Sequence, residues 1–244
     1  IQIMLAKGSE ILVNLLRTQL KEDFFMFTEE ALQGFVDSSL GKTVIVFIAL
    51  VLVALFAGNL YKKKNLSVKA LAYSGLAIAL ATILSNFTLF QLPQGGSVTP
   101  FSMMFIVLIG YWFGPLEGIL AGITYGLLQL ALGGYVVHPA QLLLDYPLAF
   151  GALGLSGFFK KGSYSLIYGY AVGVFGRFVC SFLSGWIFFG AYAWEGFDPI
   201  TYSILYNLSY IGIEMVLTIL LFMIPSFRFA LNHIKKTVNV NEYA

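Results

Sequence analysis

The chain of 244 residues is 59% hydrophobic and only 11% charged, with a formal net charge of +2. Soluble domains have roughly a quarter of their residues charged, so this chain lacks the polar side chains to cover a globule of its size in water. Its apolar surplus indicates an integral membrane protein, and its small net charge argues against a nucleic-acid partner. With one cysteine and two histidines, neither a disulfide framework nor a metal site is expected.

The beginning of the chain predicts a surface helix. Between residues 3 and 20, charged side chains interrupt the apolar positions, which is unlike a signal peptide. The apolar positions recur at nearly helical spacing: Ile11, Leu12, Leu15, Leu16 and Leu20. We expect an amphipathic helix at the membrane surface, and the alternative is a role in binding a partner.

About seven segments are long and apolar enough to cross a bilayer as helices. They are residues 43–61, 68–89, about 100–112, 115–132, 139–159, 163–190 and 200–224. Helix-breaking residues separate several of them: Pro93, Gly95, Gly96, Gly114, Pro115, Gly133, Gly134 and Pro139. The predicted fold class is therefore all-α, a polytopic membrane helix bundle.

Lysine and arginine predict the orientation of this bundle. They cluster at 62–64, 160–161 and 228–236, and with alternate crossings all three clusters fall on one side. The positive-inside rule assigns that side to the cytoplasm, together with the C-terminus. The connections 90–99, 133–138 and 191–199 have no Lys or Arg and are expected outside.

Three ionisable side chains lie within predicted spans, where they are costly and hence functional candidates. Arg177 and Glu214 lie near the middle of consecutive antiparallel spans, so we expect them to form a structural ion pair. Asp145 has no evident partner. It is expected to contact a solute, and the alternative is a carboxylate hydrated at the interface.

Aromatic and polar residues gather at the same outer depth as Asp145. They are Tyr135, Tyr146, Gly185, Phe189, Tyr192, Trp194, Tyr202, Tyr206 and Asn207. An interfacial aromatic belt would account for Trp194 and some of the tyrosines, but not for an aspartate and an asparagine. A carboxylate with aromatic faces suits an organic cation, and the Asn207 amide suits an amino-substituted nitrogen heterocycle.

Small residues recur in the second predicted span. Gly75 and Ala79 are four apart, as are Ala77 and Ala81. This spacing lets another helix approach closely, which fits either a partner-docking face or internal packing.

No catalytic residue is expected. Residues 154–157 match the GxSG pattern of rhomboid intramembrane proteases, but Ser156 has no histidine close to it in the predicted topology. Small residues at a helix end are the preferred explanation. The sequence also has no GxxxxGK[ST] phosphate loop.

Five stretches carry a family resemblance: residues 92–97, 125–129, 138–150, 182–189 and 202–207. In sequence and order they resemble the ThiT (YuaJ) family, the thiamine-binding S components of energy-coupling factor transporters. The resemblance spans about two-thirds of the chain, and the first predicted span lies outside it. It implies a six-helix S-component core, which we place at 68–225. The topology derived above adds an extracellular amphipathic segment at 1–42, an extra N-terminal transmembrane helix at 43–61 and a cytoplasmic tail at 226–244.

The resemblance also implies a function and a site. The chain would capture thiamine at the bacterial plasma membrane, without a cofactor, and act with a transmembrane coupling protein and two ATPases that use ATP. Gly75 and Ala79 would dock on the coupling protein. The ligand contacts would fall on Tyr135, Asp145, Tyr146, Ser181, Gly185, Phe189, Tyr202 and Asn207.

Three positions depart from the family pattern. Ser181 stands where a histidine often occurs, Phe189 where a tryptophan can occur, and Asp145 replaces a glutamate. The alternatives are therefore an S component for another vitamin or precursor, and a stand-alone secondary transporter of an organic cation.

Overall fold

The structure is a computed structural model that describes residues 67–159 and 161–239, together with 14–21 and the single positions 23, 31, 34, 35 and 38. Residues 14–21 are helical and exposed, in agreement with this part of the predicted surface helix. The predicted first span at 43–61 and the lysines at 62–64 lie outside the described residues.

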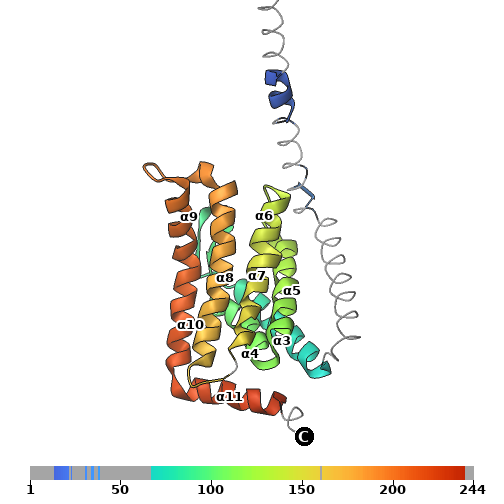
Figure 1. Cartoon of the computed structure of the whole chain (residues 1–244), viewed down its shortest axis with the longest axis vertical. Coiled ribbons are helices and arrows are strands. Elements are labelled where there is room, and N and C mark those ends of the chain that lie inside the picture. The colour runs from blue at the N-terminus through green and yellow to red at the C-terminus, as the bar shows by residue number, and fades with distance from the viewer. Residues whose placement is uncertain are drawn as a thin grey trace, which may run out of the picture.

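A bundle of apolar helices forms the body of the protein (Figure 1). Helices α3 (Val68–Ser85), α5 (Pro115–Gly133) and α8 (Ser165–Phe188) are each long and apolar enough to cross a membrane. So is the continuous helix made of α9 (Pro199–Asn207), η5 (Leu208–Gly212) and α10 (Ile213–Met223). The chain is a multi-pass membrane protein, as predicted.

Two further helical segments complete the bundle. Helix α4 (Ser102–Phe113) is shorter than the spans and almost entirely buried. The segment from 139 to 158 is helical throughout but changes its winding, from α6 (Pro139–Leu143) through the π-helical η2 (Leu144–Leu148) and α7 (Ala149–Ala152) to the 3-10 helix η3 (Leu153–Phe158). A π-helical turn is a frequent feature of functional sites.

Helix starts follow the local chemistry of the sequence. Pro115, Pro139 and Pro199 each occupy the first turn of a helix, where the missing N–H costs nothing. The Asp198 carboxylate caps α9 by accepting from the N–H groups of Ile200 and Thr201. Hydrogen bonds from the Thr201 hydroxyl and backbone lower the pKa of this exposed carboxyl.

Glycines allow α5 and the segment 139–158 to pack backbone against backbone. A Cβ added to Gly154 would lie 2.0 Å from the backbone nitrogen of Ile119. Ser156, in the same motif, is buried, and its hydroxyl donates to the Val107 carbonyl oxygen at 2.8 Å. The GxSG motif at 154–157 therefore belongs to helix packing, as the sequence analysis preferred.

The connection between α3 and α4, which the sequence analysis expected on the outer side, contains a small hairpin. Strands β1 (Phe90–Gln91) and β2 (Ser97–Val98) pair antiparallel around the short helix η1 (Pro93–Gly95). The turn needs a left-handed backbone at Gln94 (φ 60°) and Gly95 (φ 90°). Strands this short have no periodicity that a sequence pattern could reveal.

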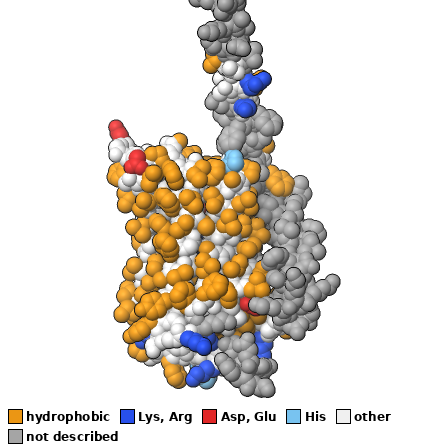
Figure 2. All heavy atoms as spheres, in the orientation of Figure 1, with side chains coloured by type: hydrophobic (Ala, Val, Ile, Leu, Met, Phe, Trp, Pro, Cys, Tyr) orange, Lys and Arg blue, Asp and Glu red, His pale blue; other side chains and the backbone are white. Residues whose placement is uncertain are grey.

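The predicted C-terminal tail is largely a helix. Helix α11 (Pro225–Asn239) follows α10 after Ile224 and turns across the end of the bundle (Figure 1). The visible side of the bundle is mostly apolar, and Lys and Arg side chains gather at the end where α11 lies (Figure 2). Acidic side chains are seen at the opposite end, and one lies nearer to the α11 end. The basic end is the one that the positive-inside rule assigns to the cytoplasm, and this orientation stays a prediction.

Candidate ligand-binding site

A cavity of about 200 Å³ opens in the bundle toward the end opposite α11. Its walls come mainly from α5, the segment 139–158, α8 and α9, with single residues from α3, α4 and η5, and the hairpin contributes residues 94–97. Every position expected to contact the ligand lines this cavity: Tyr135, Asp145, Tyr146, Ser181, Gly185, Phe189, Tyr202 and Asn207. Residues from distant parts of the sequence thus meet in one place.

One oxygen of the Asp145 carboxylate is hydrogen-bonded and the other is open. Its Oδ2 accepts from Gln141 Nε2 and from the Ser184 hydroxyl, each at 2.7 Å. Within the described part of the chain, Oδ1 accepts no hydrogen bond. The two donors fix the carboxylate while leaving one oxygen available to a ligand in the cavity.

The π-helical turn η2 sets the position of Asp145 and its neighbour Tyr146. Pro147 lies inside this turn and supplies no N–H to the helix. The Tyr146 hydroxyl donates to the Tyr135 carbonyl oxygen at 3.3 Å, which ties the turn to the end of α5. A Cβ on Gly126 would lie 2.3 Å from the Tyr146 carbonyl oxygen, so this close approach requires glycine.

Aromatic rings form two groups beside the cavity. Phe189 lies 6.1 Å, centroid to centroid, from Tyr135 and from Tyr192. Tyr202 lies 5.6 Å from Tyr206 and is packed edge-on by Trp194 at 5.2 Å. Trp194 is half exposed and does not line the cavity, in agreement with an interfacial role.

Asn207 is buried, and both ends of its amide are engaged. Nδ2 donates to the carbonyl oxygens of Ser203 at 2.9 Å and Ser181 at 3.2 Å, and Oδ1 accepts from the Tyr210 hydroxyl at 2.8 Å. The amide therefore holds α9 against α8. A ligand contact with Asn207 would have to replace one of these bonds.

Gly185 is required where α8 and α9 approach each other. A Cβ at this position would lie 2.3 Å from the Ser203 hydroxyl oxygen and 3.1 Å from Asn207 Nδ2. Arg177, Ser181, Gly185 and Phe189 are each four residues apart and all line the cavity, so they follow one face of α8.

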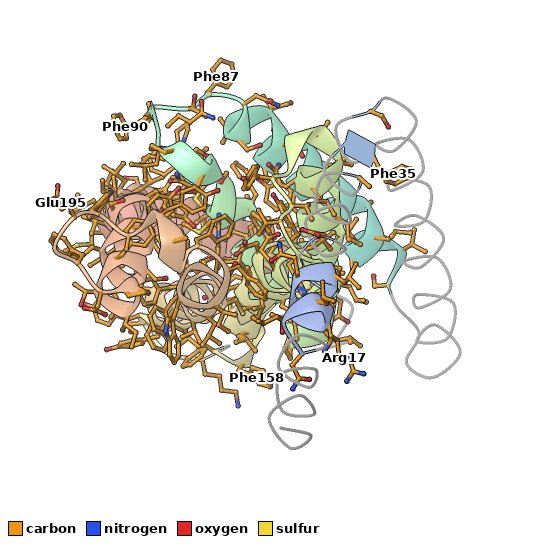
Figure 3. All side chains as sticks on the ribbon, turned by 90° about the horizontal axis from the view of Figure 1, so that it is seen from above. Arg17, Phe35, Phe87, Phe90, Phe158 and Glu195 are labelled. Atoms are coloured by element: carbon orange, nitrogen blue, oxygen red, sulfur yellow. The ribbon has the colours of Figure 1, made fainter. Side chains whose placement is uncertain are left out.

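The hairpin covers part of the cavity and is attached to α9. The Tyr206 hydroxyl accepts from the Gly96 N–H at 3.0 Å and donates to the Pro93 carbonyl oxygen. The Tyr202 hydroxyl reaches Gln94 Oε1 at 3.5 Å. In the view from above, Phe87, which precedes the hairpin, and Phe90 of β1 point away from the bundle (Figure 3). The turn of the hairpin, at residues 94–97, lines the cavity instead.

The predicted direct ion pair between Arg177 and Glu214 is wrong. The Glu214 carboxylate instead accepts from the hydroxyls of Thr99 at 2.8 Å and Ser102 at 3.1 Å, and from the Met103 N–H at 2.9 Å. The sequence placed the two charges at similar depth but did not reveal this set of neutral donors at the start of α4.

Arg177 lies in the cavity wall. Its guanidinium carbon is 4.2 Å from the Phe150 ring centroid, and its buried Nε has no hydrogen-bond partner among the described residues. A cation–π contact stabilises the charge without using the N–H donors. Among the described residues no hydrogen bond uses the terminal guanidinium N–H groups, which remain available to an acceptor on a ligand in the cavity.

The sequence analysis missed several cavity residues. They include Ser85, Gln94, Gly96, Tyr125, Gln129, Gln141, Ser184 and Tyr210. Gln141 could have been predicted as a cavity residue, because it lies four residues before Asp145 and hence on the same helix face. The hairpin residues belonged to a quoted family stretch, but nothing in their types indicated a cavity role.

The two pairs of small residues in α3 have different surroundings. Ala77 and Ala81 are buried, which internal packing explains. Gly75 and Ala79 are exposed, and a Cβ on Gly75 would meet no described atom within 4 Å. Among the described residues, no group of three or more His, Cys, Asp or Glu side chains is placed to hold a metal ion.

Comparison with known proteins identifies the family of the chain. The model of the family described as thiamine transporter protein (Thia_YuaJ) matches residues 71–233. The chain belongs to this family. Its members are transporters, so the chain is not an enzyme.

Named relatives and a solved structure are similar to the chain. Thiamine transporter ThiT of Bacillus subtilis (strain 168) is 35% identical over 165 residues, which cover 62% of this chain and 79% of that protein. ThiT of Lacticaseibacillus paracasei is 37% identical over 116 residues, which cover 41% of this chain and 58% of that protein. A solved structure of ThiT from Listeria monocytogenes has a TM-score of 0.53 at 24% identity, covering 65% of this chain and 96% of that one. At that identity the likeness shows the fold alone.

Proposed function

We propose that the protein is a high-affinity thiamine-binding membrane subunit, the S component of an energy-coupling factor uptake transporter. The observation that carries this proposal is a cavity in which a carboxylate with one open oxygen lies among aromatic rings, in a chain of the thiamine transporter protein family.

The cavity has the chemistry that thiamine requires. Thiamine carries a permanent positive charge on its thiazolium ring, and the open Oδ1 of Asp145 supplies a counter-charge. The faces of Phe189, Tyr202 and Tyr135 attract a flat cation, by roughly 0.5–2 kcal/mol for each contact. The terminal N–H groups of Arg177, which lines the cavity, match an acceptor on thiamine, either a pyrimidine nitrogen or the hydroxyl oxygen.

Partner subunits are part of the proposal. The sequence has no phosphate loop, so the ATP-dependent step is assigned to two ATPase subunits and a transmembrane coupling protein. The exposed Gly75 and Ala79 on α3 offer the coupling protein a surface on which a helix can pack closely.

The direct test is titration of thiamine against the purified protein, followed by tryptophan fluorescence. Trp194 is a suitable reporter because it packs against Tyr202 of the cavity wall. Mass spectrometry of small molecules released from the same preparation identifies a different ligand if thiamine does not bind. Uptake that persists without co-purifying ATPase subunits would instead favour a stand-alone secondary transporter.

Cysteine labelling tests the proposed orientation. Cys180 is first replaced by serine, and single cysteines are then placed at the exposed positions Glu195 and Ser163. In intact cells, an impermeant thiol reagent is expected to modify the cysteine at 195 and to spare the one at 163. Labelling of position 163 without membrane permeabilisation would contradict a cytoplasmic location for the end where α11 lies.

Bulky residues at Gly75 and Ala79 test the docking surface. The double variant Gly75→Leu/Ala79→Leu is expected to bind thiamine normally as a purified protein, because neither residue lines the cavity. Thiamine uptake by cells should fail, since two leucines push a partner helix away from α3. Val216→Phe, at an exposed position of α10, is the matched control. Unchanged uptake in the double variant would show that the coupling protein docks elsewhere.

A further inference from the structure

Gln141 connects two parts of the cavity wall. It lies in α6, at the end of the bundle opposite α11 (Figure 1), and only 1% of its surface is exposed. Nε2 donates to the Tyr135 carbonyl oxygen at 3.1 Å and to Asp145 Oδ2 at 2.7 Å. Oε1 accepts from the Val137 N–H at 3.1 Å. One buried side chain thus bonds both to the carboxylate and to residues 134–138, the connection between α5 and α6.

These partners leave the Gln141 amide a single orientation. The Tyr135 carbonyl and an ionised Asp145 carboxylate can only accept hydrogen bonds, and the Val137 N–H can only donate. Both N–H groups of Nε2 are therefore in use. A ligand could bind to them only by breaking one of these bonds, so the geometry points to a role in holding other residues.

The two acceptors of the amide belong to different parts of the site. Asp145 supplies the open Oδ1, whereas the Tyr135 ring lies 6.1 Å from that of Phe189, and both rings line the cavity. The connection 134–138 has no helix or strand of its own to fix Tyr135. Gln141 therefore sets the position of an aromatic wall relative to the carboxylate.

Other contacts share this work and should preserve the fold without Gln141. The Ser184 hydroxyl also donates to Oδ2 of the carboxylate, at 2.7 Å, and the Tyr146 hydroxyl also donates to the carbonyl oxygen of residue 135, at 3.3 Å. Val136 is buried against neighbouring apolar side chains. Among the described residues, Gln141 alone bonds to both the carboxylate and the connection 134–138.

We propose that Gln141 is a positioning residue of the ligand site, which holds the Asp145 carboxylate and the Tyr135 ring in place for a flat cation. This inference rests on the proposed function, in which the cation is thiamine. A charge and a ring that face the same ligand bind it best when they are ordered beforehand, because ordering them on binding costs affinity. Gln141 provides that order without touching the ligand.

Two ligands separate positioning from general support of the fold. Thiamine and an uncharged analogue, in which a thiophene ring replaces the thiazolium, are titrated against the purified full-length protein. Gln141→Met keeps the length of the side chain and removes its hydrogen bonds. It should weaken thiamine binding about tenfold, because the carboxylate loses a donor, and weaken binding of the uncharged analogue by a smaller factor. A change that only loosened the fold would weaken both equally.

Matched variants isolate the two contacts of the amide. Ser184→Ala removes the other donor to the carboxylate but leaves the connection 134–138 attached, so it should weaken binding of thiamine and spare the uncharged analogue. Gln91→Met makes the same chemical change at an exposed position of β1 outside the cavity lining and should alter neither affinity. Gln141→Asn keeps a polar amide that is too short to reach both partners, and it should reproduce the effect of Gln141→Met.

Hydrogen exchange tests the connection 134–138 in the ligand-free protein. The Val137 N–H donates to Gln141 Oε1, so it should exchange faster in Gln141→Met and at the wild-type rate in Ser184→Ala. This measurement needs no ligand. It therefore tests Gln141 even if the wild type binds no thiamine, a result that would contradict the proposed function instead.

Three results would overturn the proposal. Wild-type thiamine affinity in both Gln141 variants would show that the amide does not position the site. Loss of affinity by the same factor for thiamine and the uncharged analogue would make Gln141 a support of the fold alone. An unchanged exchange rate of the Val137 N–H in Gln141→Met would show that the connection 134–138 is fixed without this side chain.

Discussion

Asp145→Asn is expected to weaken thiamine binding by at least about tenfold, which corresponds to 1.4 kcal/mol. The substitution keeps the size of the side chain but removes the charge that faces the thiazolium. With its amide oxygen at the Oδ2 position the variant keeps the bonds from Gln141 and Ser184, so its amide nitrogen replaces the open Oδ1 and presents N–H donors to the cation. A buried group left unmatched costs about 1–3 kcal/mol.

Titration of thiamine against purified wild-type and variant proteins, followed by tryptophan fluorescence, measures this effect. Asp198→Asn is the matched control, since Asp198 is an exposed helix cap at the same end of the bundle and does not line the cavity. Its thiamine affinity should equal that of the wild type. Wild-type affinity in both Asp145→Asn and Asn207→Ala would mean that thiamine binds elsewhere.

The helices and many of the residues that line the cavity could be predicted because they rest on strong sequence signals. A span is a long apolar segment, and its ends are marked by residues such as Pro115 and Pro139. The family stretches then placed Asp145, Phe189 and Tyr202 in one site. These assignments needed no knowledge of which atoms touch.

The parts that could not be predicted depend on such contacts. The hairpin is held by the Tyr206 hydroxyl, from a helix more than a hundred residues away in sequence. The donors to Asp145 are Gln141 on its own helix and Ser184 on α8, and only Gln141 has a local signal. The winding change at η2 leaves no periodicity in the sequence, although it orients Asp145 and Tyr146.

The incorrect prediction of an ion pair between Arg177 and Glu214 also concerns contacts that the sequence does not reveal. Two opposite charges at similar depth predict a pair, because an unpaired charge in a bilayer is costly. A charge can also be stabilised by neutral groups, and Glu214 and Arg177 show two ways of doing so. Glu214 accepts three hydrogen bonds, and Arg177 lies against the Phe150 ring. Only coordinates distinguish these arrangements from a direct pair.

Glu214→Gln is expected to lower the stability of the protein by about 1–3 kcal/mol, the cost of leaving buried hydrogen-bonding groups unmatched. Helix α4 starts at Ser102 after Phe101, whose side chain makes no capping bond. The Glu214 carboxylate from α10 takes over that function, since it accepts the Met103 N–H and places negative charge at the helix start. A glutamine keeps one acceptor oxygen and loses the charge.

The effect on ligand affinity should be small in comparison, because Glu214 does not line the cavity. Thermal unfolding in one detergent measures stability, and thiamine titration of the folded fraction measures affinity. Glu195→Gln, in an exposed outer loop, is the control and should change neither. Equal unfolding temperatures for Glu214→Gln and the wild type would show that the hydrogen bonds from Thr99, Ser102 and Met103 do not secure α4. A large loss of thiamine affinity with normal stability would instead show that Glu214 contributes to the ligand site. Its charge would then act through Thr99 and Ser102, which donate to it and line the cavity.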